Sequence, residues 1–137
     1  MVKQNSIKIP AKASTRGVHI ITNEIAKHIK IQNGIANIFL KHTSASLALN
    51  ENFDSDVPLD IEDFLNHLIP DCWQSFRHVL EGCDDMSAHM KNIFIGSSLT
   101  IPITEGKLNL GTWQGVYLLE HRNFGGSREI FVTQIGE

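Results

Sequence analysis

The chain has 137 residues, of which 42% are hydrophobic, and its net charge is -3. This length and apolar content suit one domain with an ordinary core, so we treat residues 1–137 as a single unit. Its 12 basic residues form no run that would follow a phosphate backbone, and no apolar stretch has the length of a membrane span. We therefore expect no nucleic-acid partner, no membrane association and a cytoplasmic location.

The first half of the chain predicts four strands and two helices. Alternation of apolar and polar residues indicates strands, and Asn33-Gly34 is a turn signal. Thr22 is placed to cap a short helix over residues 23–30, and residues 58–69 have the apolar spacing of a longer helix that Pro70 ends. The expected strands cover residues 7–9, 17–21, 35–40 and 46–50.

A third helix is predicted to begin at Asp85, with Asp84 as its cap and Gly96 as a left-handed residue that closes it. Helical spacing puts His89 on the same polar face as Asp85, one turn further on. The neighbouring face is apolar and should pack into the protein. It consists of Met86, Met90, Ile93 and Phe94.

The last third of the chain changes to the alternation that is typical of strands. Turn residues stand at Glu105-Gly106 and Gly125-Gly126. The strands expected there cover residues 99–103, 108–110, 116–120 and 129–135. The fold class predicted is therefore α+β, a single compact domain with an antiparallel or mixed β-sheet and about three short helices.

The two cysteines, Cys72 and Cys83, do not form a C-x-x-C pair. The sequence leaves a disulfide between them open, but nothing in it requires one. Since a reducing cytosol keeps thiols free, we expect free thiols here.

Four of the seven histidines stand where a scaffold presents functional groups, namely His42, His78, His89 and His121. The first three would supply three imidazoles to one divalent cation and leave a fourth position open, with Glu81 or Asp85 as a base or supporting group. The ordinary alternative is that Asp84 and Asp85 cap a helix and that His89 pairs with Asp85. Spacing alone favours this alternative.

Other polar groups suggest an anionic, flat substrate. Asp84 and Asp85 would hold a diphosphate through magnesium. The hydroxyls of Thr43, Ser44 and Ser46, together with Lys91 and Arg122, would contact its oxygens. Trp113 and Gln114, with Asn50 and Glu51, would meet a heterocycle. For each of these groups the ordinary alternative to a binding role is structural. The polar groups would belong to solvated turns, and the tryptophan would be a core residue at the end of a hairpin.

Taken together, these segments resemble the YjbQ family, small proteins described as secondary thiamine-phosphate synthases. The resemblance runs from Ile7 to the C-terminus. Two positions depart from the family pattern, because Cys83 and Ser87 stand where the family commonly has proline, which loosens the backbone there. The segments that carry the resemblance are HTSASL (42–47), NEN (50–52), EG (81–82), DDM (84–86), AH (88–89) with Lys91, GSSL (96–99), LGTWQG (110–115) and EHR (120–122).

The resemblance implies a homotrimer with its histidines gathered in a pocket. It also implies a weak ability to join a pyrimidine methyl diphosphate to a thiazole phosphate, with release of diphosphate. The residues expected to act on such a phosphorylated substrate are His42, Glu81, Asp85, His89 and His121.

Two other functions stay open. One is a metal-dependent hydrolase of a small phosphorylated metabolite, with a transition metal on His42, His78 and His89. The other is a non-catalytic trimer that binds an anionic metabolite. The cofactor expected is a divalent metal ion, either zinc at a histidine site or magnesium on a diphosphate.

Overall fold

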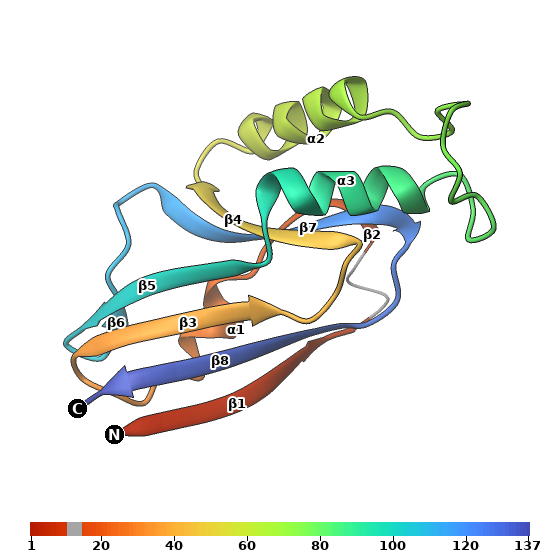
Figure 1. Ribbon diagram of the computed structural model, residues 1–137. Coiled ribbons are helices and arrows are strands. Elements are labelled where there is room, and N and C mark those ends of the chain that lie inside the picture. The colour runs from red at the N-terminus through yellow and green to blue at the C-terminus, as the bar shows by residue number, and fades with distance from the viewer. Residues whose placement is uncertain (11–14) are drawn as a thin grey trace.

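Two antiparallel β-sheets and three helices make up the computed structural model, which describes residues 1–10 and 15–137 (Figure 1). The strands are β1 (Val2–Ile9), β2 (Thr15–Ile20), β3 (Gly34–Leu40), β4 (Ala45–Glu51), β5 (Ser98–Thr104), β6 (Lys107–Leu108), β7 (Gln114–Phe124) and β8 (Arg128–Gly136). The helices are α1 (Thr22–Ala26), α2 (Asp56–Leu68) and α3 (Asp85–Ile95). The larger sheet has the order β1-β8-β3-β5-β6, and the smaller one has the order β2-β7-β4.

The core lies between the two sheets, because alternate residues of each strand point to the same face. Ile38 of β3, Val132 of β8 and Leu118 of β7 are fully buried there. On its other face β7 buries Tyr117 and Leu119, since α2 and α3 cover the outer side of the smaller sheet (Figure 1). The molecule therefore has three layers, with the helices outermost.

The predicted α+β class is confirmed, and each predicted strand is present. The strand predicted over residues 108–110 is confined to Lys107–Leu108, whereas most other strands are longer than predicted, β1 and β7 by the most. β7 pairs with β2 on one side and β4 on the other, so its hydrogen bonds continue beyond the alternating segment. β1 pairs with β8 from Val2 onwards although its first residues are polar and exposed. Within the described residues, no helix has the length and apolarity needed to cross a membrane.

α3 begins at Asp85 directly after Asp84, as predicted, but neither Thr22 nor Asp84 caps a helix with its side chain, because each has another partner. The hydroxyl of Thr22 accepts the backbone N–H of Val116 (2.9 Å), and α1 ends at Ala26. The Asp84 carboxylate accepts the N–H of Asn123 (2.8 Å) and makes no cap bond in α3. Gly96 has φ 110° but ψ 170°, so it is not a left-handed helical residue.

The apolar face of α3 does not pack inward as predicted. Ile93 and Phe94 are 79% and 71% exposed, whereas Lys91 is fully buried. The reason is that the interior surface under α3 offers polar partners, such as the side chain of Asn66 on α2. On α2 as well, Phe64 is exposed (62%). Both helices thus turn apolar side chains outward.

The prediction of free thiols is also wrong, since Cys72 and Cys83 form a disulfide. The backbone N–H of Cys72 donates to the carbonyl of Cys83 (3.1 Å), and this turns the loop back on itself. The two Cα atoms are 4.7 Å apart, within the usual range for a bridge. Such a loop closure depends on tertiary structure and leaves no spacing signal.

Candidate functional site

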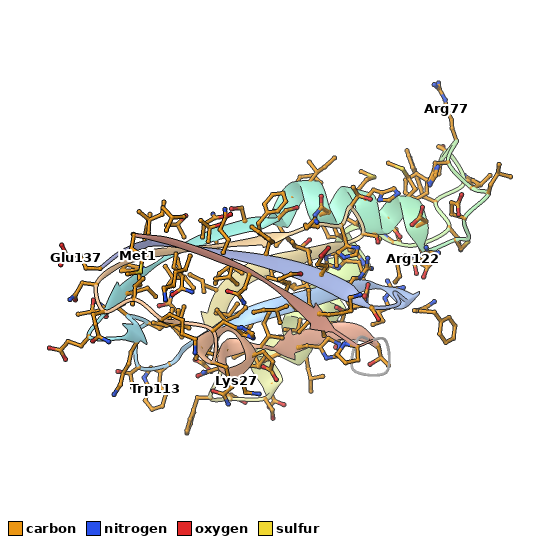
Figure 2. All side chains as sticks on the ribbon, turned by 90° about the horizontal axis from the view of Figure 1, so that it is seen from below. Met1, Lys27, Arg77, Trp113, Arg122 and Glu137 are labelled. Carbon is orange, nitrogen blue, oxygen red and sulfur yellow. A yellow bond between two sulfur atoms is a disulfide. The ribbon has the colours of Figure 1, made fainter. Side chains whose placement is uncertain are left out.

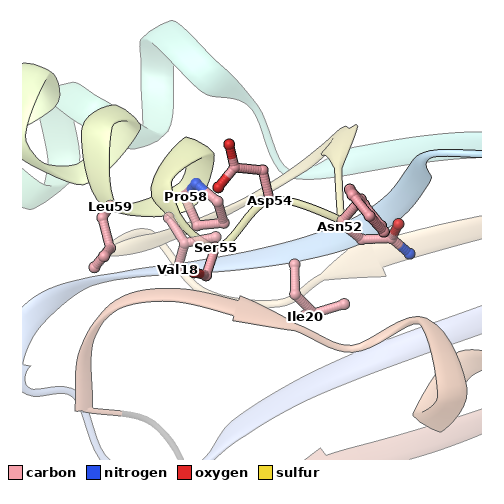
Figure 3. Close-up of a pocket in the computed structure, with 8 residues that line it drawn as sticks. Val18, Ile20, Asn52, Asp54, Ser55, Pro58 and Leu59 are labelled. Atoms are coloured by element: carbon pink, nitrogen blue, oxygen red, sulfur yellow. The ribbon is translucent and has the colours of Figure 1, made fainter.

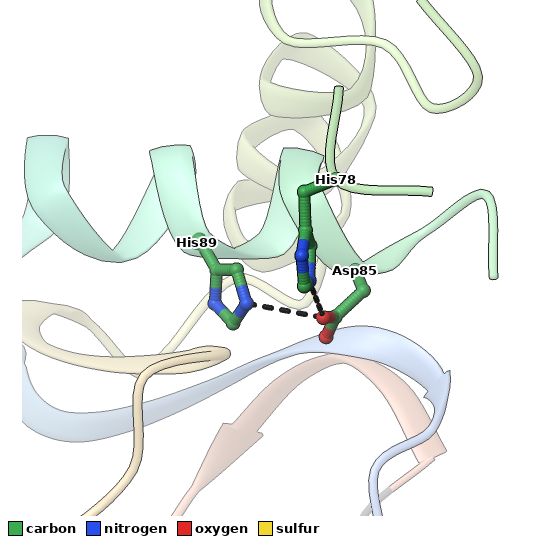
Figure 4. A group of neighbouring side chains, drawn as sticks. All are labelled: His78, Asp85 and His89. Atoms are coloured by element: carbon green, nitrogen blue, oxygen red, sulfur yellow. Dashed lines mark hydrogen bonds and ion pairs between the residues drawn. The ribbon is translucent and has the colours of Figure 1, made fainter. Parts of the chain in front are cut away.

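Two imidazoles and a carboxylate converge beside the first turns of α3 (Figure 4). Asp85 and His89 lie one helical turn apart, and His78 comes from the loop that precedes the helix. The Asp85 Oδ2 atom is 2.6 Å from His78 Nε2 and 3.1 Å from His89 Nε2. The prediction that Asp85 and His89 share a face is therefore confirmed.

Arg122, at the far end of β7, borders this cluster. Its Nη1 lies 3.3 Å from Asp85 Oδ1, while Nη2 donates to the carbonyl of Glu81 (2.7 Å) and to Asp84 Oδ1 (3.2 Å). Burial raises the pKa of Asp85, but the His78 hydrogen bond and the positive charges of His89 and Arg122 outweigh it, so this pKa is lowered. Asp85 is thus an anion held among cationic partners.

The tautomer of His89 follows from its neighbours. Its Nδ1 is 2.8 Å from the carbonyl oxygen of Thr43, which can only accept, so Nδ1 carries the hydrogen. In neutral His89 the Nε2 lone pair therefore faces a carboxylate oxygen of Asp85. Two lone pairs at that distance repel each other unless a proton or a metal ion lies between them. A histidine whose other nitrogen donates to a carbonyl is also the usual arrangement of a metal ligand.

The donor set suits a divalent transition metal. His78, Asp85 and His89 each offer one ligand atom, and these atoms lie within 4.8 Å of one another. Two nitrogens and one oxygen are typical of zinc and its neighbours rather than of magnesium. Asp84 is not a free ligand, because one oxygen accepts from Arg122 and the other from the N–H of Asn123. The predicted Asp84–Asp85 magnesium site is therefore not assembled.

His42 does not join this group. Its Nε2 accepts the backbone N–H of Glu129 (2.7 Å) at the start of β8. Burial and the nearby charge of Arg128 lower its pKa, which favours the neutral form that accepts this bond. The expected triad of His42, His78 and His89 is thus replaced by one in which Asp85 takes the third place.

Several predicted site residues lie inside the protein. Lys91 is fully buried, and its Nζ donates to Asn66 Oδ1 (2.6 Å). Burial lowers the pKa of Lys91. His121 is also fully buried, its Nε2 lies 2.8 Å from the Ser46 hydroxyl, and burial lowers its pKa to about 3. Ser44 is buried too. None of these groups is open to a substrate at the surface.

A second set of predicted residues lies at the opposite end of β4 and β7. Trp113 and Arg122 are far apart along the molecule in Figure 2. Glu51 of β4 pairs with Gln114 at the start of β7, whereas Ala45 pairs with Glu120 near its end. A shallow pocket of about 420 Å³ is lined there by Asn50, Glu51, Trp113 and Gln114, among others. Within one chain, a single small substrate does not reach both ends.

Two residues that hold the turn beside the site, Glu120 and Arg128, were not predicted from the sequence. Arg128 is bidentate on Glu120, with Nε to Oε1 at 2.7 Å, and its Nη2 donates to the carbonyl of Ser44 (3.3 Å). This contact braces the turn whose Thr43 carbonyl holds His89. One signal was available: alternation places Glu120 on the inward face with Val116 and Leu118, where a carboxylate requires a cation.

Among the hollows near α2 and α3, two bear on the site. One, of about 190 Å³, adjoins the cluster and is lined by the disulfide loop, with Trp73, Phe76, His78 and Val79 on its wall. The other, of about 350 Å³, lies between β2 and the start of α2 (Figure 3). Its lining is mostly apolar, and Asp54 is its one acidic side chain. The first hollow is therefore the one that adjoins the cluster of His78, Asp85 and His89.

Comparison with known proteins finds one family. The profile described as "UPF0047 protein YjbQ-like" matches residues 5–137. The UPF0047 protein YjbQ of Escherichia coli O157:H7 is 42% identical over 138 residues, which cover 98% of each chain. That of Salmonella typhimurium is 44% identical over 126 residues, or 89% of this chain and 91% of its own.

Solved structures agree with the fold. A YjbQ/UPF0047 protein from Clostridium acetobutylicum is 35% identical, has a TM-score of 0.84 and covers 96% of this chain and 99% of its own. A protein of unknown function from Sulfolobus solfataricus is 28% identical and has a TM-score of 0.87. The match covers 100% of this chain and 99% of that protein.

Proposed function

The chain belongs to the UPF0047 YjbQ-like family, and on that premise we propose that it is a metal-dependent transferase acting on a small phosphorylated metabolite. A divalent cation would be held by His78, Asp85 and His89. The proposed reaction is a weak synthesis of thiamine phosphate. In it, a thiazole ring nitrogen attacks the methylene carbon of a pyrimidine methyl diphosphate, the carbon–oxygen bond breaks, and diphosphate leaves with the electron pair.

One observation carries the proposal. The Thr43 carbonyl fixes one hydrogen of His89 on Nδ1, so that in the neutral ring Nε2 points its lone pair at Asp85 Oδ2 from 3.1 Å. That arrangement requires positive charge between the two atoms. A metal ion satisfies it while also accepting the Nε2 lone pair of His78, which releases the proton now shared with Asp85.

The surroundings suit a departing diphosphate. The Arg122 side chain is 27% exposed and is fixed by three oxygen partners. A guanidinium held in this way is preorganised to stabilise charge that develops on a leaving phosphate. When bound, a divalent cation would supply further charge stabilisation there. The 190 Å³ hollow beside His78 has Trp73 and Phe76 on its wall and would admit one small ring.

Hydrolysis is the second candidate, and the donor chemistry favours it. Two imidazole nitrogens are ligands that zinc prefers, and zinc sites with an open position commonly activate water. Asp85 would stay a ligand, and Glu81, an exposed residue whose backbone carbonyl contacts Arg122, would serve as the base. The two reactions share the same cation site and differ in the acceptor.

Metal analysis tests the cation site directly. Protein purified without added metal and then titrated with Zn²⁺ or Co²⁺ should bind one equivalent. His89→Ala and Asp85→Asn should each weaken binding by more than the ~10- to 100-fold typical of losing a supporting hydrogen bond. His67→Ala, which removes an exposed histidine of α2, is the matched control and should bind as the wild type does. Equal binding by all four proteins would disprove the site.

Activity is tested on the same proteins. Wild-type protein with its metal should form thiamine phosphate and diphosphate from the two heterocyclic phosphates, whereas Asp85→Asn should not. Turnover of a phosphate ester or cyclic phosphate with water, but not of this pair, would select the hydrolase. A protein that binds metal and turns over no compound of a broad metabolite set would be a binding protein, and the proposed enzyme function would be wrong.

A further inference from the structure

The disulfide closes the loop that carries His78. Residues between Cys72 and Cys83 form neither helix nor strand, and the backbone hydrogen bonds within the loop are local, from Phe76 to Trp73 (3.0 Å) and from Gly82 to Val79 (3.4 Å). The loop is strongly exposed, with Leu80 at 96%. Local turns of this kind hold the loop in one conformation only weakly. The position of the loop therefore depends on how its two ends are attached to the rest of the fold.

Few contacts hold the loop interior against the rest of the chain. In the described residues, its hydrogen bonds to other elements are His78 Nε2 with Asp85 Oδ2 (2.6 Å) and the Glu81 carbonyl with Arg122 (2.7 Å). The disulfide joins the residue after Asp71 to the residue before Asp84 and, together with the hydrogen bonds of these two carboxylates, fixes where the loop leaves and re-enters the fold. His78 is therefore placed by a covalent bond that lies outside the site.

We infer that the Cys72–Cys83 disulfide is a redox-modification site that controls the cation site through His78. The inference rests on the proposed function in that it takes the cation site as its target. With the bond intact, His78 is held against Asp85, and the three-ligand site is complete. When the bond is reduced, the loop gains conformational freedom, His78 leaves, and two ligands remain on α3.

A dithiol supplies the two electrons that reduction needs. One thiolate of the reductant attacks a sulfur of the pair, whose residues are both exposed, and forms a mixed disulfide. The second thiol of the reductant then attacks that bond and closes its own disulfide. Two electrons and two protons pass to Cys72 and Cys83, which become free thiols, and the reductant is oxidised.

The rest of the site does not depend on this bond. Ser87 near the start of α3 donates to Asp71 Oδ1 (2.5 Å), and Asn92 donates to the Ala45 carbonyl (2.7 Å). These contacts keep Asp85 and His89 on a fixed helix in either redox state. The effect of reduction should thus fall on His78 alone.

Co²⁺ titration of oxidised and reduced full-length protein tests the inference. The reduced sample is prepared with dithiothreitol, which is removed under argon before Co²⁺ is added. Reduction should weaken Co²⁺ binding by about 10- to 100-fold, as for other losses of ligand positioning. The double variant Cys72→Ser/Cys83→Ser should match the reduced wild type and ignore the reductant. Unchanged or tighter binding on reduction, as thiolate ligation would give, overturns the inference.

His78→Ala shows whether the effect passes through His78. This variant lacks the controlled ligand, so its weaker Co²⁺ affinity should be the same in the oxidised and reduced states. A redox effect that persists in His78→Ala would mean that the disulfide acts by another route, and the inference would be wrong.

A metal-free readout separates this inference from the proposed function. In imidazole NMR spectra of metal-free protein, reduction should move the His78 signals to those of a free, solvated ring. The signals of His28, whose Nδ1 lies 2.7 Å from Asn5 Nδ2, should stay unchanged. If oxidised protein binds no Co²⁺, the cation site is disproved, while the His78 signals still decide whether the disulfide positions the ring. Signals that do not move reject the inference.

Discussion

At the scale of single residues, the chemistry of the site depends on where hydrogen atoms are held. The Thr43 carbonyl decides the tautomer of His89, and Arg122 keeps Asp85 anionic. His121, one residue before Arg122, has the opposite environment. It is fully buried, its Nδ1 has no hydrogen-bond partner, and the cations Lys91 and Arg16 act on it. One ring thus faces a carboxylate near the surface, and the other is kept neutral by burial.

The neutral state of His121 predicts a pH-dependent stability. Unfolded His121 takes up a proton below about pH 6.5, whereas burial lowers the pKa of the folded residue to about 3. The unfolded state therefore binds more protons between these values, and stability falls as the pH falls through that interval. Between pH 7 and pH 5 the wild type should lose about 2 kcal/mol more of its free energy of unfolding than His121→Gln, at about 1.4 kcal/mol per pKa unit.

Urea unfolding at pH 7, 6 and 5 measures this difference. Glutamine keeps a hydrogen-bonding group for Ser46 but does not titrate, so the comparison isolates the imidazole. The lowered pKa values of Asp71 and Asp85 affect stability only at lower pH, because each carboxylate loses its contribution as the pH falls through its folded pKa. Parallel pH profiles for the two proteins would show that His121 is not held neutral.

At the scale of elements, the turn between β7 and β8 places the Arg128–Glu120 pair. A Cβ at Gly125 would overlap the Glu120 carboxylate, so this position requires glycine for space. Gly125→Ala should force Glu120 away from Arg128, which is 4% exposed, and leave a buried charge unpaired. Breaking such a pair costs about 3–5 kcal/mol. The free energy of unfolding from denaturant titration should fall by that amount.

The neighbouring glycine supplies the matched control. Gly126 has φ +74°, and a Cβ there meets nothing within 4 Å, so Gly126→Ala adds only backbone strain. That strain costs about 1–2 kcal/mol. If Gly125→Ala is no more destabilising than Gly126→Ala, the Glu120–Arg128 pair does not depend on the space that Gly125 leaves.

The helices and strands also show which features of the fold can be predicted from the sequence and which cannot. Strands were predictable because alternation reports which face of a sheet is buried, as along β3 and β8. Helical spacing likewise placed Asp85 and His89 together. Caps were not predictable, since Thr22 and Asp84 bond to β7, which is distant in sequence. The place of His78 depends on a disulfide loop, and no local pattern encodes that.

The interior polar residues were missed for the same reason. Lys91, Ser46 and His121 lie in segments that look suited to binding an anion, because each carries a polar group at an element end or on a helix face. Their partners come from other elements: Asn66 of α2 binds Lys91, and the Ser46 hydroxyl of β4 meets the ring of His121. Only the packing of α2 and α3 on the smaller sheet shows that these groups face inward.

At the scale of the whole molecule, the outer helix layer leaves apolar side chains unpaired. Ile93 and Phe94 of α3 and Phe64 and Leu68 of α2 are each more than half exposed. Exposed apolar side chains are common where one protein surface packs against another. The family resemblance implies a homotrimer, and we propose that these helix faces meet other copies of the chain.

Phe94→Asp tests this assembly. Light scattering after gel filtration should give the wild type a mass three times the 15.3 kDa of the chain. The variant should give the mass of one chain, because a charge replaces an aromatic ring whose burial is worth about 1.5–3 kcal/mol at every copy of the contact. Phe124→Asp is the control, since Phe124 is 95% exposed and is the last residue of β7 rather than a residue of either helix. Dissociation by Phe124→Asp with an intact Phe94→Asp trimer would place the interface elsewhere, and a monomeric wild type would reject the assembly itself.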